Sequence, residues 1–195
     1  MAASRMTESL FTWSFSLRLF HVVLILSLVI AYIFSDEQTM LLHSWCGYIA
    51  ALMLVWRIYM GLFGRGWEHF SKSHGSLPEL FRRPADAVKA SSLEYRGHTP
   101  PAALVMILIL MALASTIISG MLSQGAMEFE GFFAPYLLDL DVRTARNILH
   151  WHEWSVNVLI LLSAAHLGGV MKDQVLHKSR VALAMITGYK EQYVR

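Results

Sequence analysis

The chain has 195 residues, of which 55% are hydrophobic and only 15% are charged. Soluble domains average about 25% charged residues, and the mean hydropathy of this chain is +0.46. The composition therefore argues against an ordinary soluble domain and against disorder. A net charge of +2 gives no support for nucleic-acid binding. The single cysteine, Cys46, excludes an internal disulfide framework and a CxxC redox pair.

Four long apolar segments follow one another along the chain, at about residues 17–34, 43–63, 102–122 and 150–171. Each is near the roughly 20 residues that a helix needs to cross about 30 Å of hydrocarbon. The first segment lacks a small-x-small cleavage site at its end, so we expect it to remain as a span. Because no repeat or linker separates domains, we predict one all-α membrane domain over residues 1–195, a four-transmembrane-helix bundle.

Local signals mark the ends of these spans. Thr99 and Pro100 have the pattern of an N-cap followed by proline at the first helical position, which predicts the start of the third span. Gly64 and Gly66 fit the end of the second span, and Gly125 is expected just past the third.

Lysine and arginine are unevenly distributed over the segments that connect the spans. The connection at 35–41 has none, 64–101 has six, 123–149 has two and the tail after 171 has five. Positively charged loops stay on the cytoplasmic side, so we expect both termini and residues 64–101 there. The connection at 123–149, which is acidic and aromatic, is expected at the outer surface of the membrane.

Four histidines form two pairs at matched depths in these spans. His43 and His152 begin the second and fourth spans on the outer side, whereas His21 and His166 lie near the inner ends of the first and fourth. Ionisable groups inside a membrane are costly and usually mark a functional site. The pairs His43/His152 and His21/His166 are therefore candidate metal ligands.

Helical phase distinguishes between two neighbouring histidines in the fourth span. His152 and His166 are 14 residues apart, which is about 40° short of four full turns and about 21 Å along the axis. Both therefore point from one face. His150 is about 160° out of phase with His166. We predict that His152 is the ligand and that His150 lies at the membrane interface.

The second span repeats this spacing with an arginine. Arg57 follows His43 by 14 residues and shares its face, with Gly47, Ala50 and Gly61 along the same stripe. Small residues there let a bulky planar group approach the backbone. Arg57 then either pairs with a carboxylate of a cofactor or extends to the inner headgroups.

Two histidines at each depth limit the type of metal group. Zinc and non-haem iron sites use three or four converging protein ligands. Two axial histidines suffice when a porphyrin supplies the other four ligands. The sequence therefore favours two non-covalent bis-histidine haems, one at each depth. Such a haem has no vacant iron position, which favours electron transfer over oxygen binding.

An ordered set of motifs resembles the prokaryotic cytochrome b561 family, which includes the b-type cytochrome subunits of nickel-iron hydrogenases. The matching segments are residues 18–21 (RLFH), 42–48 (LHSWCGY) with Arg57, 97–100 (GHTP), 152–153 (HE), 166–170 (HLGGV) and 184–188 (AMITG). Three positions depart from the family pattern. Val22 stands where tryptophan is common, and Pro101 and Ala102 stand where glycine usually follows the third motif.

The resemblance implies a multi-pass protein of the bacterial inner membrane with two haems b. It also implies contact with quinone and with a redox partner on the periplasmic side, such as a hydrogenase-like subunit or a c-type cytochrome. His98, at the inner end of the third span, would contact a haem propionate, exchange protons at a quinone site, or only cap the span at the interface. Electron transfer between quinone and partner is the favoured function, and membrane lipid is the expected surrounding.

Two alternatives stay open on the sequence alone. The first is a stand-alone quinone-linked oxidoreductase that acts on a small oxidant such as superoxide. The second is a four-helix metal or solute transporter that uses the histidines directly, although the sequence has no inverted repeats or broken half-helices. Whether the chain is itself an enzyme or an electron-transfer subunit is not decided by its sequence.

Overall fold

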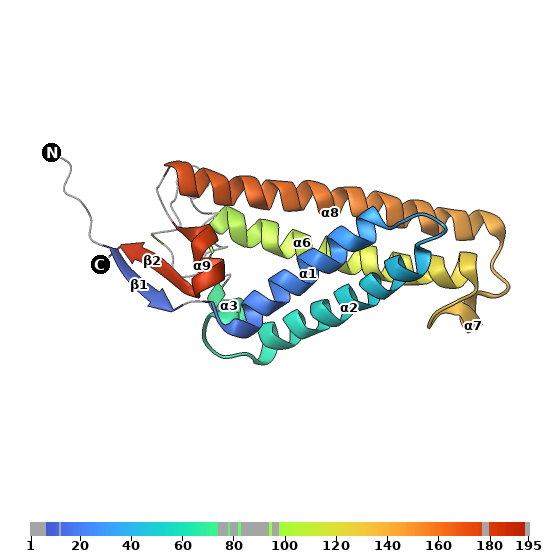
Figure 1. Cartoon of the computed structure of the whole chain (residues 1–195), viewed down its shortest axis with the longest axis horizontal. Coiled ribbons are helices and arrows are strands. Elements are labelled where there is room, and N and C mark those ends of the chain that lie inside the picture. The colour runs from blue at the N-terminus through green and yellow to red at the C-terminus, as the bar shows by residue number, and fades with distance from the viewer. Residues whose placement is uncertain are drawn as a thin grey trace. The chain divides into compact units, whose positions relative to one another are not determined.

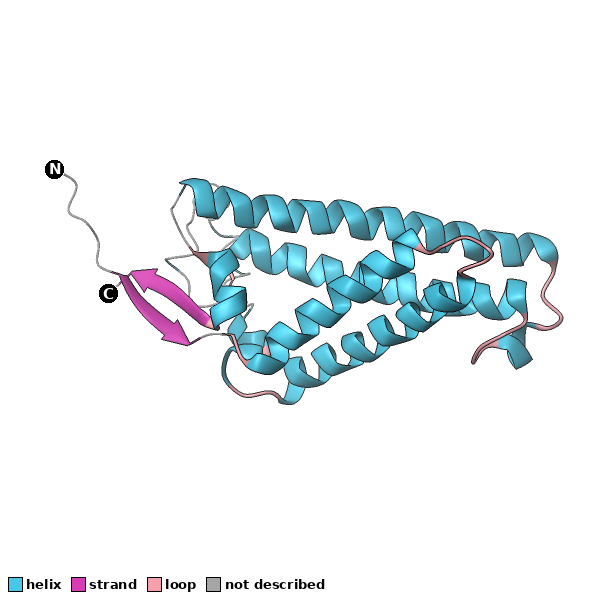
Figure 2. Cartoon of the chain, viewed as in Figure 1, coloured by secondary structure: helices cyan, strands magenta, loops and turns pink. Residues whose placement is uncertain are grey.

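The computed structural model describes residues 7–11, 13–73, 98–176 and 180–193, together with Pro78, Arg82 and Glu94. Four long helices dominate this part of the chain (Figures 1 and 2): α1 (Phe15–Ile33), α2 (Met40–Phe63), α6 (Pro100–Ser123) and α8 (Val142–Leu176). All four are long and apolar enough to cross a membrane. The prediction of an all-α membrane fold with four spans is therefore confirmed.

The helix boundaries follow the local signals in the sequence. α6 begins at Pro100, where the N–H of Ala103 donates to the carbonyl of Thr99 at 2.9 Å. α2 ends at Phe63, directly before Gly64. α8 begins eight residues before the predicted span, because Asp141 caps it with a bond from the N–H of Thr144 at 3.0 Å. Hydrogen bonds from Thr144 lower the pKa of the exposed Asp141 carboxyl.

The third span continues past the point where the sequence predicts its end. The π-helix η3 (Gln124–Glu128) extends α6, and the helical path stops at Phe129, which has a positive φ of 56°. Gly125 is therefore inside the helical segment and buried, so its predicted place just past the span is wrong. The glycine is needed for packing instead, since a Cβ there would lie 2.9 Å from the backbone nitrogen of Ala134.

Short elements complete the described chain. They are β1 (Thr7–Phe11), η1 (Gly66–Glu68), α3 (Phe70–Ser73), α7 (Ala134–Leu137), α9 (Val181–Thr187) and β2 (Tyr189–Tyr193). The strands β1 and β2 pair antiparallel, with Thr7 opposite Tyr193 and Phe11 opposite Tyr189. This sheet is not part of the sequence prediction. It brings the two ends of the chain together, which agrees with an even number of spans, while the side on which they lie stays a prediction.

The chain divides into two compact units, and each long helix contributes a part to both. Unit 1 comprises Met1–Val22, Trp56–Ile107 and Ala164–Arg195, and unit 2 comprises Val23–Val55 and Leu108–Ser163. Buried side chains of unit 1 include Leu17, Phe20, Met60 and Met106; those of unit 2 include Leu24, Cys46, Leu54, Leu113 and Leu159. Many large apolar side chains of the spans are exposed. An exposed apolar surface of this extent fits contact with lipid.

We expect Gly125→Ala to lower stability by roughly 1–3 kcal/mol, because the added methyl group meets backbone atoms that cannot move aside independently. A Cβ on residue 125 would lie 3.0 Å from the carbonyl carbon of Phe133 and 2.9 Å from the nitrogen of Ala134. Gly168→Ala is the matched control, since nothing lies within 4 Å of a Cβ there. Thermal unfolding in detergent should separate the two variants, and equal midpoints would contradict the packing role of Gly125.

Candidate metal centre

The outer histidine pair lies together in unit 2. The ring centroids of His43, on α2, and His152, on α8, are 6.1 Å apart, and the ring planes make an angle of 81°. Two imidazoles bound to one metal ion through bonds of about 2 Å place their ring centroids roughly 6 Å apart. The observed separation fits an ion held between these two rings.

Backbone carbonyl groups determine which ring nitrogen of each outer histidine is available. His43 Nδ1 lies 2.8 Å from the carbonyl oxygen of Ala31, and His152 Nδ1 lies 2.9 Å from that of Thr116. A carbonyl oxygen only accepts hydrogen bonds, so each Nδ1 carries the proton. The lone pair of a neutral ring is then on Nε2, as in most metal-bound histidines. Both outer rings are therefore in the tautomer that a metal ion requires.

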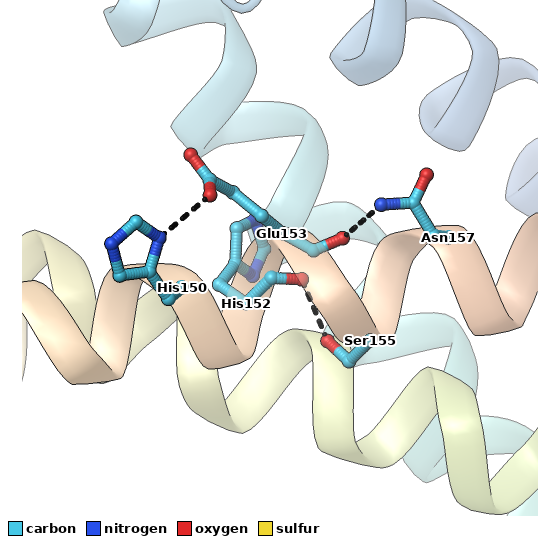
Figure 3. A network of polar contacts seen from close by, with 5 residues as sticks. All are labelled: His150, His152, Glu153, Ser155 and Asn157. Carbon is cyan, nitrogen blue, oxygen red and sulfur yellow. Dashed lines mark hydrogen bonds and ion pairs between the residues drawn. The ribbon is translucent and has the colours of Figure 1, made fainter.

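His150 is in a different environment from His152, although only two residues separate them. Its Nδ1 lies 3.1 Å from Glu153 Oε2, and the two side chains are 65% and 58% exposed. Figure 3 shows this surface pair, together with the bond from Asn157 to the backbone carbonyl of Glu153. The His152 ring is part-buried and faces His43. His152, and not His150, therefore lies next to His43, and its role as a ligand stays a prediction.

The inner pair lies in unit 1. His166 and Arg57 are both close enough to His21 to act on it electrostatically. His21 Nδ1 lies 2.8 Å from the carbonyl oxygen of Leu17, so its Nε2 is also the unprotonated nitrogen of a neutral ring. The His166 ring has no hydrogen bond among the described residues. The pairing of His21 with His166 stays a prediction.

Arg57 is buried in unit 1, at 3% exposure. Its guanidinium donates to the carbonyl oxygen of Glu68 at 3.2 Å and lies 4.5 Å from the centroid of the Phe70 ring. A side chain that extends to the headgroups would be exposed at its tip, so the burial favours the cofactor-carboxylate role. Within the described part of the chain, this one hydrogen bond leaves most of the five guanidinium N–H donors for another acceptor.

His98 contacts a residue that no sequence pattern singles out. Its ring lies edge-on to Trp13, with 5.6 Å between centroids. Trp13 is buried, and its indole N–H has no acceptor among the described residues. The position of His98 at the start of α6 is as expected. Its role stays a prediction.

The glycines of the α2 stripe do not all serve the same purpose. A Cβ on Gly47 would meet nothing within 4 Å, so there is open space one turn from His43. Gly61 is different, because a Cβ there would overlap the ring of Phe70. Gly61 thus admits the aromatic ring that lies against Arg57, rather than a planar cofactor.

Sequence reasoning missed the contribution of α6 to the outer pair. Thr116, Ser119 and Gly120 all approach His152. Their spacing of three and four residues places them on one helical face. This pattern of small and hydroxyl residues is visible in the sequence, although α6 itself has no histidine that would draw attention to it. Among the described residues, no group of three or more His, Cys, Asp or Glu side chains forms a metal site.

Acidic side chains from two connections converge near the outer pair. Glu37, Glu128 and Glu130 line an open hollow together with Met40, Leu41, Ser44 and Gln124. Glu128 is close enough to His43 to interact with it electrostatically. Phe129, Phe132 and Tyr136 are exposed in the same connection.

One comparison with known proteins identifies a family. The family model described as prokaryotic cytochrome b561 matches residues 12–188. This range contains His21, His43, Arg57, His98, His152 and His166. No curated protein and no solved structure matched the chain.

We expect His152→Ala to lose one bound haem and His150→Ala to lose none. His152 faces His43 through a ring held by a backbone carbonyl, whereas His150 pairs with Glu153 at the surface. Extraction and quantification of haem from the two purified variants measure this difference. Loss of haem from His150→Ala but not from His152→Ala would contradict the assignment.

Proposed function

Because the chain belongs to the prokaryotic cytochrome b561 family, we propose that it transfers electrons between quinone and a periplasmic redox partner through two haems b. Family membership makes it a multi-pass b-type cytochrome of the bacterial inner membrane with a role in electron transfer. The number of haems, the quinone and the partner are the proposal. The observation that supports it most directly is the facing pair of His43 and His152.

Each haem would be held by two histidines, His43 with His152 and His21 with His166. Iron held between two imidazoles exchanges one electron with little rearrangement and has no vacant position for oxygen. The residues around the rings have distinct tasks. The Nδ1–H groups of His21, His43 and His152 donate to the backbone carbonyl oxygens of Leu17, Ala31 and Thr116, respectively. These hydrogen bonds fix the rings and raise their basicity.

Arg57 would bind a propionate of the inner haem. It is buried, it lies near His21, and it has guanidinium donors beyond the one used by Glu68. The carboxylate of Glu68 already acts on Arg57 electrostatically. A propionate would bring a second carboxylate to the guanidinium, whose planar fork of donors suits such a group.

Quinone would react within unit 1, where His98 lies two residues before Pro100, the first residue of α6. Quinone chemistry moves protons together with electrons, and a histidine at the membrane edge is suited to relay them. The indole N–H of Trp13, which lies beside His98, offers a hydrogen-bond donor at the same place.

The partner would bind to residues of unit 2. Glu37, Glu128 and Glu130 present negative charge near His43, and exposed aromatic side chains adjoin them. Charge complementarity steers association between redox proteins, so these residues suit a protein with a basic face. A hydrogenase-like subunit and a c-type cytochrome are the two candidate partners.

The purified protein should contain about two b-type haems per chain, both reducible by a quinol, since there are two histidine pairs. A pyridine haemochrome assay and a redox-titrated visible spectrum measure these quantities. Within this experiment, His98→Ala should slow quinol-linked haem reduction about 100- to 10,000-fold, the range for loss of a proton-transfer group, at unchanged haem content.

Glu153→Gln is the control for that step, since Glu153 is exposed and pairs with His150. A haem content near zero or one would exclude the two-haem proposal. If Glu153→Gln stops quinol oxidation and His98→Ala does not, quinone reacts at the outer side instead.

We expect Arg57→Leu to lower the potential of the inner haem by roughly 50 mV, the equivalent of about 1 kcal/mol for one electron. The cation disfavours the oxidised haem, which is the more positive form, so its removal makes oxidation easier. Arg65→Leu is the control, because Arg65 is exposed. Potentiometry that resolves both haems measures the shift, and an unchanged inner potential would exclude the propionate contact.

A further inference from the structure

Of the four long helices, α6 is the one without a histidine, and its residues contact His152, one of the proposed ligands. Thr116, Ser119 and Gly120 of α6, which we call the α6 cradle, all lie against the ring of His152. We propose that the α6 cradle is a positioning device that fixes the ring plane of His152 and lowers the reduction potential of the outer haem. The proposal rests on the proposed function, since it requires a haem between His43 and His152.

The first contact is a shared hydrogen bond. His152 Nδ1 lies 2.9 Å from the carbonyl oxygen of Thr116 and 3.4 Å from Ser119 Oγ. Ser119 Oγ is also 2.7 Å from the carbonyl oxygen of Ser115 and 3.2 Å from that of Thr116. Its proton goes to these carbonyl oxygens, because a carbonyl only accepts. The lone pairs of Ser119 Oγ are thus left for the N–H of His152. The imidazole donates mainly to Thr116 and secondarily to Ser119.

The second contact is steric. A Cβ on Gly120 would lie 2.9 Å from Cε1 and 3.1 Å from Nδ1 of His152. Real Cβ atoms do not approach a ring so closely, and any larger residue would push the ring out of its present plane. Gly120 therefore permits the close approach that the hydrogen bond to Thr116 needs. Together the two contacts leave the ring at 81° to that of His43.

Three residues of this region that carry a hydroxyl group are buried. Thr116, Ser119 and Ser155 are 7%, 3% and 2% exposed. Ser155 Oγ donates to the carbonyl oxygen of His152 at 2.8 Å, so it holds the backbone of the same residue. Among the described residues the Thr116 hydroxyl has no hydrogen-bond partner, so Thr116 acts on His152 through its carbonyl oxygen. The hydroxyl groups of Ser119 and Ser155 are hydrogen-bonded, and in a medium of low polarity such bonds are electrostatically strong. The cluster thus acts on His152 from two directions.

Two measurable quantities follow from this arrangement. A hydrogen bond from Nδ1–H makes the imidazole a stronger donor to iron and stabilises the oxidised state, which lowers the potential. The angle between the two ring planes controls the anisotropy of the ferric low-spin EPR signal, and nearly perpendicular planes give the most anisotropic signal. The outer haem should therefore show a highly anisotropic signal.

The test uses the full-length, haem-loaded protein and three variants of α6. Ser119→Ala should keep the wild-type haem content and raise the midpoint potential of one haem only. Gly120→Ala should shift the EPR signal of one haem, because the methyl group turns the ring. Ser115→Ala is the matched control, since its hydroxyl accepts from the indole of Trp151 at 3.0 Å and should leave both quantities unchanged.

Ser119→Thr keeps the hydroxyl group and should restore the wild-type potential, which distinguishes a hydrogen bond from a loss of packing. If Gly120→Ala loses haem, the comparison of Ser119→Ala with Ser119→Thr still decides the question. The proposed role of the α6 cradle is overturned if the protein binds two haems but Ser119→Ala and Gly120→Ala have the same midpoint potentials and EPR signals as Ser115→Ala. A wild-type protein without an outer haem would instead overturn the proposed function itself.

Discussion

The arrangement of this protein depends on the need to satisfy an imidazole N–H inside the membrane. A histidine in a span cannot rely on water, so its N–H group requires an acceptor from the protein. His21, His43 and His152 each use a backbone carbonyl oxygen for this purpose. A carbonyl oxygen is present at every residue and has a second lone pair beyond its helical hydrogen bond. This solution fixes the ring and its tautomer together, and only Nε2 remains for a metal.

The spans and the facing of His43 and His152 were predictable because they depend on local, periodic features. Apolar length predicts a span, and Thr99 and Pro100 predict where α6 begins. The choice of His152 over His150 needs only the geometry of a regular helix. α8 is continuous from Val142 to Leu176, and His152 lies next to His43. That His152 is the ligand stays a prediction. A kink in α8 between His152 and His166 would have invalidated the phase argument.

Other features depend on contacts between segments that are distant in sequence, and no local pattern reveals them. Gly125 has the appearance of a helix stop, yet its hydrogen side chain is needed where the backbone of Ala134 passes. Gly61 has the appearance of space for a planar group, yet Phe70 fills that space. In both cases the sequence shows that a side chain is missing but does not show which neighbour uses the room. The contacts by which α6 orients His152 also join segments that are distant in sequence, so no local pattern reveals them.

The pairing of β1 with β2 has a consequence for biosynthesis. β1 is translated before the first span and β2 after the fourth, so the sheet can form only when every span has been made. A strand of five residues without a partner has unpaired N–H and C=O groups along both edges. Closure of the chain into a ring therefore coincides with completion of the membrane domain. A nascent chain that stops early keeps an open strand, which a protease or a chaperone can recognise.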